Sequence, residues 1–392
     1  MNRYLSFILL SFIFGGPLEH SAFAAQQENT NWCIIGGGPA GIIMVSMLRD
    51  LGIPDSEIFW VDANQFNVGR LSSYPTVPGN VKTGYLVNFF KSLKTFKEVS
   101  APALNKLLHS NEYDLSLECP LKVITDPLQE VTDHLLTKVN AIHGKVKSLD
   151  FVDDNWHVTI NDTKITAHYA VLATGSHPRQ LNYGISEIPF DLALDKDALA
   201  SQVKPHDVVA VVGSAHSAIL ILKFLSEIRV GRIINLYTEP IKYTVDMGGW
   251  FLHQEEGLKG ITARWAQEVL EKKLPSNLIR VINNAETRKR WLANCTKIIY
   301  ACGFERNNLP IINGKKTDGS YDETTGTIGQ RLFGFGIAFP EKVTDKAGNT
   351  EHRVGLLSFL SYAQRVVPEW ITTKDFVESC YNFDSLFVID ML

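Results

Sequence analysis

One glycine-patterned turn limits what this chain can fold into more than any other feature. An apolar segment that ends at Ile35 runs directly into Gly36-Gly37-Gly38-Pro39-Ala40-Gly41, and an apolar helical segment follows. Strand, turn and helix in this order are typical of a dinucleotide-binding βαβ unit. Gly36 permits the tight turn, Gly38 lets a pyrophosphate approach the backbone, and Gly41 lets helix and strand pack closely. We expect phosphates to bind at the N-terminus of this helix.

A carboxylate in the right place supports this interpretation. Asp62 ends the next apolar run, Ile58 to Val61, about 20 residues after Gly41, where dinucleotide-binding units carry the acid that receives the ribose hydroxyls. Strand, turn, helix, strand and acid together are more specific than the glycines alone.

The same pattern returns later in the chain. The strand segment Val208 to Val212 runs into Gly213-Ser214-Ala215-His216-Ser217-Ala218 and then into an apolar helix. Ala215 stands where the middle glycine is expected, so a methyl group would lie on the path of a pyrophosphate. The chain therefore contains two nucleotide-type turns, the second weaker than the first.

Further elements complete the expected organisation. The segment 64–80 is rich in Gly, Pro, Ser and Asn, which predicts a long loop. Helical spacing marks residues 84–93, 101–109 and 127–136, and alternating strands at 145–149, 156–160 and 165–172 predict a small antiparallel meander. Apolar strands also lead into Ala173-Thr174-Gly175, Ala301-Cys302-Gly303-Phe304 and the glycine-rich segment 332–338.

The N-terminus indicates export. Arg3, an apolar stretch and Ala22-Phe23-Ala24 have the pattern of a secretory signal peptide over residues 1–24. The apolar stretch is short for a membrane span of about 20 residues, so we expect cleavage, no stable membrane insertion, and a periplasmic or secreted protein. The alternative is an N-terminal anchor with a cytoplasmic catalytic domain.

Charge and cysteine usage exclude several classes of function. The 38 basic and 42 acidic residues show no basic block, so nucleic acid is not an expected partner. The His and Cys residues lack metal-ligand spacing, so no metal site is expected. The five cysteines, Cys33, Cys119, Cys295, Cys302 and Cys380, contain no CxxC pair, which argues against a redox-active dithiol.

Taken together, the motifs at Gly36 to Gly41, Ala173 to Gly175, Gly213 to Ala218 and Ala301 to Phe304 resemble the FAD/NAD(P)-binding oxidoreductases with two dinucleotide domains. The resemblance is greatest to the flavin-containing and N-hydroxylating monooxygenases. It implies an α/β fold with two Rossmann-like domains of the glutathione-reductase-like kind, the second inserted in the first. The expected FAD domain spans 30–182 and 296–392, with a helical insertion at about 84–136, and the NAD(P)-binding-like domain spans 205–295.

The resemblance also assigns roles to residues. The first turn would hold FAD, the second would hold NADPH or NADH, and Asn80 would lie near the reactive edge of the flavin. An acid or a cation after the strand that ends at Tyr237 would choose between NADH and NADPH, and Glu239 and Lys242 leave that choice open. The cofactor-binding residues implied are Gly36, Gly38, Pro39, Ala40, Gly41, Asp62, Arg70, Val146, Thr174, Gly175 and Gly336 for FAD, and Gly213, Ala215, His216 and Ser217 for NAD(P)H.

The expected function is that of an FAD-dependent oxidoreductase acting on a small molecule. In its monooxygenase form, NAD(P)H passes a hydride to flavin N5, and the reduced flavin then activates oxygen for a soft nucleophile such as an amine or sulfide. Exported proteins meet little NAD(P)H, and Ala215 weakens the second turn. Two alternatives therefore stay open: an FAD oxidase or dehydrogenase reduced by its substrate, and a non-catalytic flavin- or nucleotide-binding protein.

Overall fold

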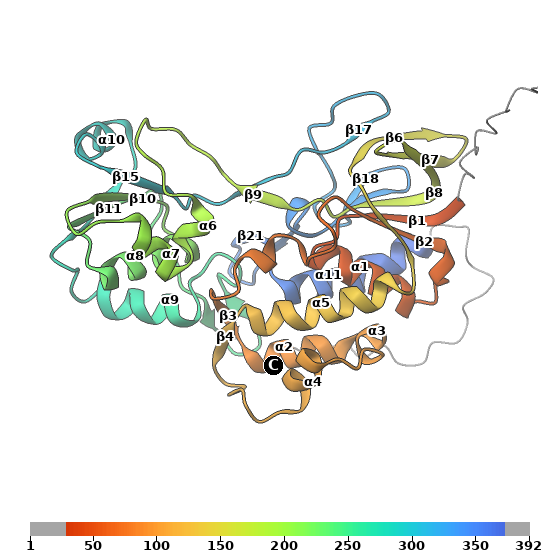
Figure 1. Cartoon of the computed structure of the whole chain (residues 1–392), viewed down its shortest axis with the longest axis horizontal. Coiled ribbons are helices and arrows are strands. Elements are labelled where there is room, and N and C mark those ends of the chain that lie inside the picture. Colours follow the sequence, from red (N-terminus) through yellow and green to blue (C-terminus); the bar gives the residue numbers. More distant parts are fainter. Residues whose placement is uncertain (1–28, 373–392) are drawn as a thin grey trace, which may run out of the picture.

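The computed structural model describes residues 29–372. The expected signal peptide and Cys380 lie outside these residues. Figure 1 shows two lobes, each built on its own sheet, joined by extended segments at one edge. Across the described residues, none of the helices combines the length and the apolar character that crossing a membrane requires.

The larger lobe contains a nine-stranded sheet around the first glycine turn. Strand β1 (Asn29–Ile35) pairs in parallel with β2 (Ile58–Asp62) on one side and with β8 (Thr163–Leu172) on the other. The expected meander is confirmed, because β6 (Val146–Val152), β7 (Asn155–Ile160) and β8 pair antiparallel in sequence. The remaining strands are β5 (Asn140–His143), β17 (Ile311–Ile312), β18 (Thr327–Gly329) and β19 (Leu332–Gly334).

The smaller lobe contains a parallel sheet in the order β14 (Leu278–Ile282), β11 (Arg232–Tyr237), β10 (Val208–Val212) and β15 (Lys297–Tyr300). The boundary expected at residue 295 is therefore corrected to a position after Tyr300. The segment 297–300 closes the second sheet beside β10, as β8 lies beside β1 in the first. The strands that precede and follow the smaller lobe in the sequence belong to the larger sheet. The smaller lobe is therefore an insertion in the larger one.

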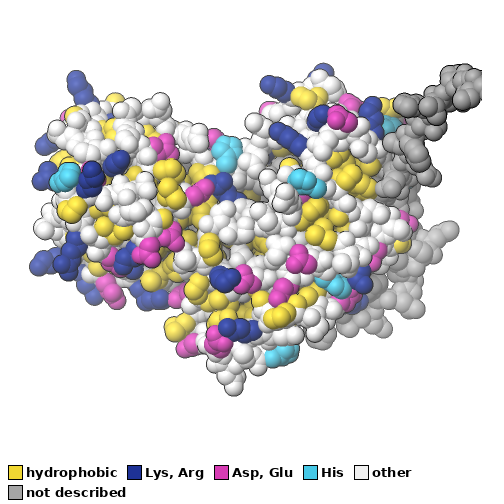
Figure 2. Space-filling model, in the orientation of Figure 1, with side chains coloured by type: hydrophobic (Ala, Val, Ile, Leu, Met, Phe, Trp, Pro, Cys, Tyr) yellow, Lys and Arg dark blue, Asp and Glu magenta, His cyan; other side chains and the backbone are white. Residues whose placement is uncertain are grey.

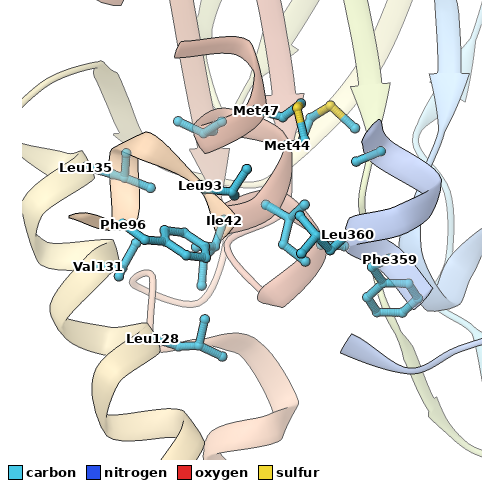
Figure 3. Packing of buried hydrophobic residues seen from close by; sticks show 14 of the residues in the cluster. Ile42, Met44, Met47, Leu93, Phe96, Leu128, Val131, Leu135, Phe359 and Leu360 are labelled. Atoms are coloured by element: carbon cyan, nitrogen blue, oxygen red, sulfur yellow. The ribbon is translucent and has the colours of Figure 1, made fainter. Parts of the chain in front are cut away.

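Helix α1 (Pro39–Asp50) forms the centre of the larger core. Its residues 40–48 are all buried, because neighbouring helices cover it on both sides. In Figure 3, Ile42, Met44 and Met47 lie between side chains from α5 (Lys122–Leu136) and α3 (Lys94–Lys97) on one side and Phe359 and Leu360 of α11 (Leu356–Thr372) on the other. The helices α2 (Thr83–Ser92) and α4 (Pro102–His109) complete the expected helical insertion.

Two expectations about element bounds are corrected. Helix α5 begins at Lys122 and not at Pro127, because Leu121 O accepts the first helical hydrogen bonds and the missing N–H of Pro127 removes only one bond from the second turn. The segment expected to be a long loop contains a 3₁₀ turn at Gly69–Ser73 and the strand β3 (Pro78–Lys82), which pairs with β4 (Glu118–Pro120).

The lobes are joined by two antiparallel strands, β9 (Ser176–Pro178) and β16 (Phe304–Arg306). The smaller lobe carries α6 (Phe190–Ala193), α7 (Lys196–Gln202), α8 (His216–Ile228), α9 (Gly260–Trp265), a π-helical turn at Ala266–Leu270, α10 (Ala285–Leu292) and the hairpin β12 (Val245–Asp246) with β13 (Phe251–Leu252). A last hairpin, β20 (Glu341–Thr344) with β21 (Thr350–Arg353), precedes α11. Figure 2 shows that the surface is hollowed between the two lobes.

Gly41→Ala tests the close packing of α1 on its strand. A Cβ at Gly41 would lie 1.9 Å from the carbonyl oxygen of Gly36, so the helix must move. We expect the free energy of unfolding to fall by about 3 kcal/mol or more, measured by urea denaturation. At Gly329 no atom lies within 4 Å of an added Cβ, so Gly329→Ala is the matched control. Equal stability of the two variants would contradict the packing described.

Candidate functional site

The first glycine turn is locked against the end of the neighbouring strand. Gly36 has φ +129° and donates its N–H to Val61 O at 2.8 Å. A Cβ here would lie 2.1 Å from Ala173 O, which belongs to the segment after β8. Only glycine fits both the backbone angle and the space.

The second turn repeats this geometry closely. Gly213 also has φ +129°, and its N–H donates to Leu236 O at 2.8 Å. A Cβ added at Gly213 would lie 2.0 Å from Ala301 O. Gly38 and Ala215 occupy matching positions as N-caps of α1 and α8, with φ/ψ of −80°/−176° and −88°/−173°. The internal repeat read from the sequence is thus a repeat of backbone conformation.

Gly38 is a glycine that the protein itself does not require. Its backbone conformation is open to any residue, and an added Cβ would meet only Gly69 Cα, at 3.8 Å. Open space above the N-terminus of a helix is what a pyrophosphate needs. At the second turn the exposed methyl group of Ala215 takes up part of this space.

Asp62 is buried directly beneath the first turn, with 7% of its surface exposed. Its Oδ1 accepts the N–H of Gly37 at 2.9 Å, and Oδ2 accepts the N–H groups of Asn64 and Phe66 at 2.8 and 2.9 Å. Asp62 therefore also fixes the shape of the turn. One lone pair of Oδ1 is left for a ribose hydroxyl.

The C-terminal glycine segment lies against the first turn, as the family resemblance implies. Gly336 has φ +77°, and a Cβ on it would lie 2.4 Å from the Cβ of Ala40 in the first turn of α1. Val146 begins β6 close by, since the N–H of Gly144 donates to Asp62 O at 2.8 Å. Four segments distant in sequence thus meet around the N-terminus of α1.

Thr174 and Gly175 cross between the lobes beside this site. The hydroxyl oxygen of Thr174 is buried and has no hydrogen-bond partner among the described residues, so its hydrogen-bonding capacity is unused within the protein. Asn307, which the sequence analysis does not identify, holds the segment. Its side-chain nitrogen donates to Thr174 O at 2.8 Å and its backbone N–H to Gly175 O at 3.1 Å.

Arg70 faces the smaller lobe through a salt bridge. Its Nη2 lies 2.6 Å from Asp191 Oδ1, and its Nε donates to the hydroxyl of Tyr74 at 2.8 Å. Tyr74 in turn donates to Asp191 at 2.6 Å. Arg70 therefore bridges the 3₁₀ turn at Gly69–Ser73 to α6, and its guanidinium is already paired. Asn80 is exposed on β3, a strand in contact with α9 of the smaller lobe.

His216 begins α8, but its ring is used within the protein. Nε2 lies 3.1 Å from Gly257 O and therefore donates to it, and Nδ1 lies 2.9 Å from the hydroxyl oxygen of Thr262. Burial, followed by the positive charge of Lys259, lowers the pKa of His216 to about 4. The imidazole is therefore neutral near pH 7 and offers a phosphate no positive charge. What His216 and Ser217 can offer a phosphate is their backbone N–H groups, which lie in the first turn of α8.

These features identify the protein once they are compared with known families. Residues 30–322 match the family described as pyridine nucleotide-disulphide oxidoreductase. The chain belongs to this family. It is an FAD-dependent oxidoreductase, and the resemblance drawn from the four sequence motifs is confirmed.

Individual relatives of this oxidoreductase include monooxygenases. The chain is 28% identical to Monooxygenase AgnR1 from Paecilomyces divaricatus over 382 residues. The matched region covers 86% of this chain and 97% of that protein. Its fold is similar to that of a flavin-containing monooxygenase from Stenotrophomonas maltophilia, with a TM-score of 0.57 and 13% identity over 88% of this chain and 98% of the other. It is also similar in fold to the bacillithiol disulfide reductase Bdr from Staphylococcus aureus, with a TM-score of 0.55 and 12% identity over 89% and 100%.

Gly38→Val separates flavin binding from folding. Because the backbone at Gly38 accepts any residue and no side chain lies near, we expect the circular dichroism and the urea midpoint of the apoprotein to stay unchanged. The added isopropyl group would occupy the phosphate position, so flavin affinity should fall at least 100-fold, measured by titration of the apoprotein with FAD. A yellow variant with wild-type affinity would contradict the proposed site.

His216 predicts a pH dependence of stability. The unfolded chain binds a proton near pH 6.5 and the folded chain only near pH 4, so the folded state loses stability as the pH falls between these values. We expect a contribution of about 2 kcal/mol after allowance for the partial exposure of the ring. His216→Asn should remove this part of the slope in urea denaturation at pH 7.5, 5.5 and 4.5, whereas the exposed His206→Asn should not.

Proposed function

We propose that this oxidoreductase is an NAD(P)H-dependent monooxygenase that acts on a small soft nucleophile. One observation carries the proposal: the second glycine turn keeps the backbone conformation of the first, with Gly213 and Ala301 arranged like Gly36 and Ala173. A turn of this kind directs the free N–H groups of the first turn of α8 to where the phosphates of a second dinucleotide would bind. The similarity to Monooxygenase AgnR1 along nearly its whole length supports the same function.

The described thiols argue against disulfide chemistry. Cys33 is fully buried in β1, and burial raises its pKa strongly. Burial also raises the pKa of Cys119 and Cys302, and that of Cys295 to about 11. Thiolates are the reactive form of cysteine, and these four thiols are disfavoured as thiolates.

The residues around α1 fit FAD. The open space at Gly38 suits the pyrophosphate, Asp62 Oδ1 a ribose hydroxyl, and the unpartnered hydroxyl of Thr174 a polar group of the cofactor. When bound, FAD accepts the hydride and activates oxygen. The chain contributes position at the junction of the lobes, where the salt bridge between Arg70 and Asp191 joins the 3₁₀ turn at Gly69–Ser73 to α6.

A second candidate is an FAD oxidase or dehydrogenase that is reduced by its own substrate. The methyl group of Ala215 favours it, because this group lies where the pyrophosphate of NAD(P)H would approach α8.

We also propose export through the N-terminal signal. Export would favour this candidate, since NAD(P)H is scarce outside the cytoplasm, and the mass of the purified chain reports whether residues 1–24 are removed.

Anaerobic titration of the flavin distinguishes the two candidates. We expect NADPH or NADH to bleach the flavin absorption band of the purified holoenzyme, and oxygen to restore it. Ala215→Gly should lower the Kd for the reductant about tenfold, because it reopens the phosphate path, and should leave FAD affinity unchanged as an internal control. If neither reductant bleaches either protein, the NAD(P)H-dependent function is wrong and the substrate-reduced function stands.

A further inference from the structure

The two glycine turns differ most at the end of the following strand. Gly36 bonds to Val61 and Gly213 to Leu236, so Asp62 and Tyr237 occupy the same position, one residue further along β2 and β11. This position selects between ribose hydroxyls and a ribose 2′-phosphate in dinucleotide-binding units. The first unit has a carboxylate there, and the second has a phenol.

A guanidinium lies over this phenol. Arg280 reaches up from β14, and its Cζ lies 4.8 Å from the centre of the Tyr237 ring. Its Nε donates to Asn235 Oδ1 at 2.9 Å, and the side-chain nitrogen of Asn235 donates to Gly213 O at 2.8 Å. The side chain of Asn235 therefore links the guanidinium of Arg280 to the second glycine turn.

The charge of Arg280 is not neutralised within the described residues. The bond to Asn235 is its side chain's one hydrogen bond there, and no described carboxylate forms an ion pair with it. Burial lowers its pKa, while Tyr237 and Tyr243 raise it. A half-buried guanidinium whose Nη atoms have no protein acceptor is suited to binding an anion.

The neighbouring charges do not compete for this role. Lys242 lies 2.6 Å from Glu256 and 3.5 Å from Glu239, so its charge is balanced by two carboxylates. Glu239 is the acid that follows Tyr237 most closely, and its carboxylate faces Lys242. The sequence presents both as candidates, but each faces an opposite charge, whereas the guanidinium of Arg280 has no carboxylate partner among the described residues.

We propose that Arg280 and Tyr237 form a binding site for a 2′-phosphorylated adenosine, so that the second turn takes NADPH in preference to NADH. The guanidinium would pair with the 2′-phosphate through its Nη atoms, and Asn235 would hold it in register with the pyrophosphate at α8. This inference rests on the proposed function, because it names which pyridine nucleotide that function uses.

Adenosine fragments test the site without any flavin chemistry. We expect adenosine 2′,5′-bisphosphate to bind the wild-type holoenzyme at least tenfold more tightly than 5′-AMP, measured by isothermal titration calorimetry. Arg280→Gln should remove this difference and Arg280→Lys should keep part of it. Arg290→Gln, a surface change on α10, should leave it intact. Tyr237→Asp should reverse the order of NADPH and NADH in flavin reduction.

Equal binding of the two fragments to the wild type, or a preference that survives Arg280→Gln, overturns the assignment. If NADPH and NADH still bleach the flavin equally well in that case, the proposed function stands and only the selection is wrong. Binding of neither fragment, together with a flavin band that neither reductant bleaches, overturns both.

Discussion

The fold depends on two places where a backbone turn passes against the end of a neighbouring strand with no room for a side chain. At Gly36 the carbonyl of Ala173 occupies the Cβ position, and at Gly213 the carbonyl of Ala301 does. Each contact fixes three things at once: the start of the central helix, the end of the central strand, and the segment that leaves the sheet towards the other lobe. The same two backbone contacts therefore position both the nucleotide-binding turns and the segments that connect the lobes.

The parts of this arrangement that are local in sequence could be predicted from it. Gly36, Gly38 and Gly41 mark the turn because backbone angle, open space and helix packing each require a missing side chain at a fixed spacing. Asp62 follows at a characteristic distance. The second turn is recognised in the same way, and Ala215 is visible as its exception.

Roles set by distant partners could not be predicted. Arg70 is near the first turn in sequence, but its partner Asp191 lies 121 positions away in α6, so the pairing depends on how the lobes meet. The ring of His216 is held by Gly257 and Thr262, and Thr174 by Asn307. No periodic pattern marks these partners. The sequence does not assign β15 to the smaller sheet, because a short apolar run does not show which sheet it joins.

The two antiparallel strands between the lobes have a mechanical consequence. Both passages of the chain, β9 and β16, run side by side, and bonds from Arg179 to Gly303 and from Asn307 to Gly175 fasten both ends of the pair. A paired ribbon of this kind resists stretching, because its two strands are hydrogen-bonded along their length. The ribbon therefore sets the separation of the two nucleotide sites, and the contacts of Arg70 with Asp191 and of β3 with α9 fix how the two sites face each other.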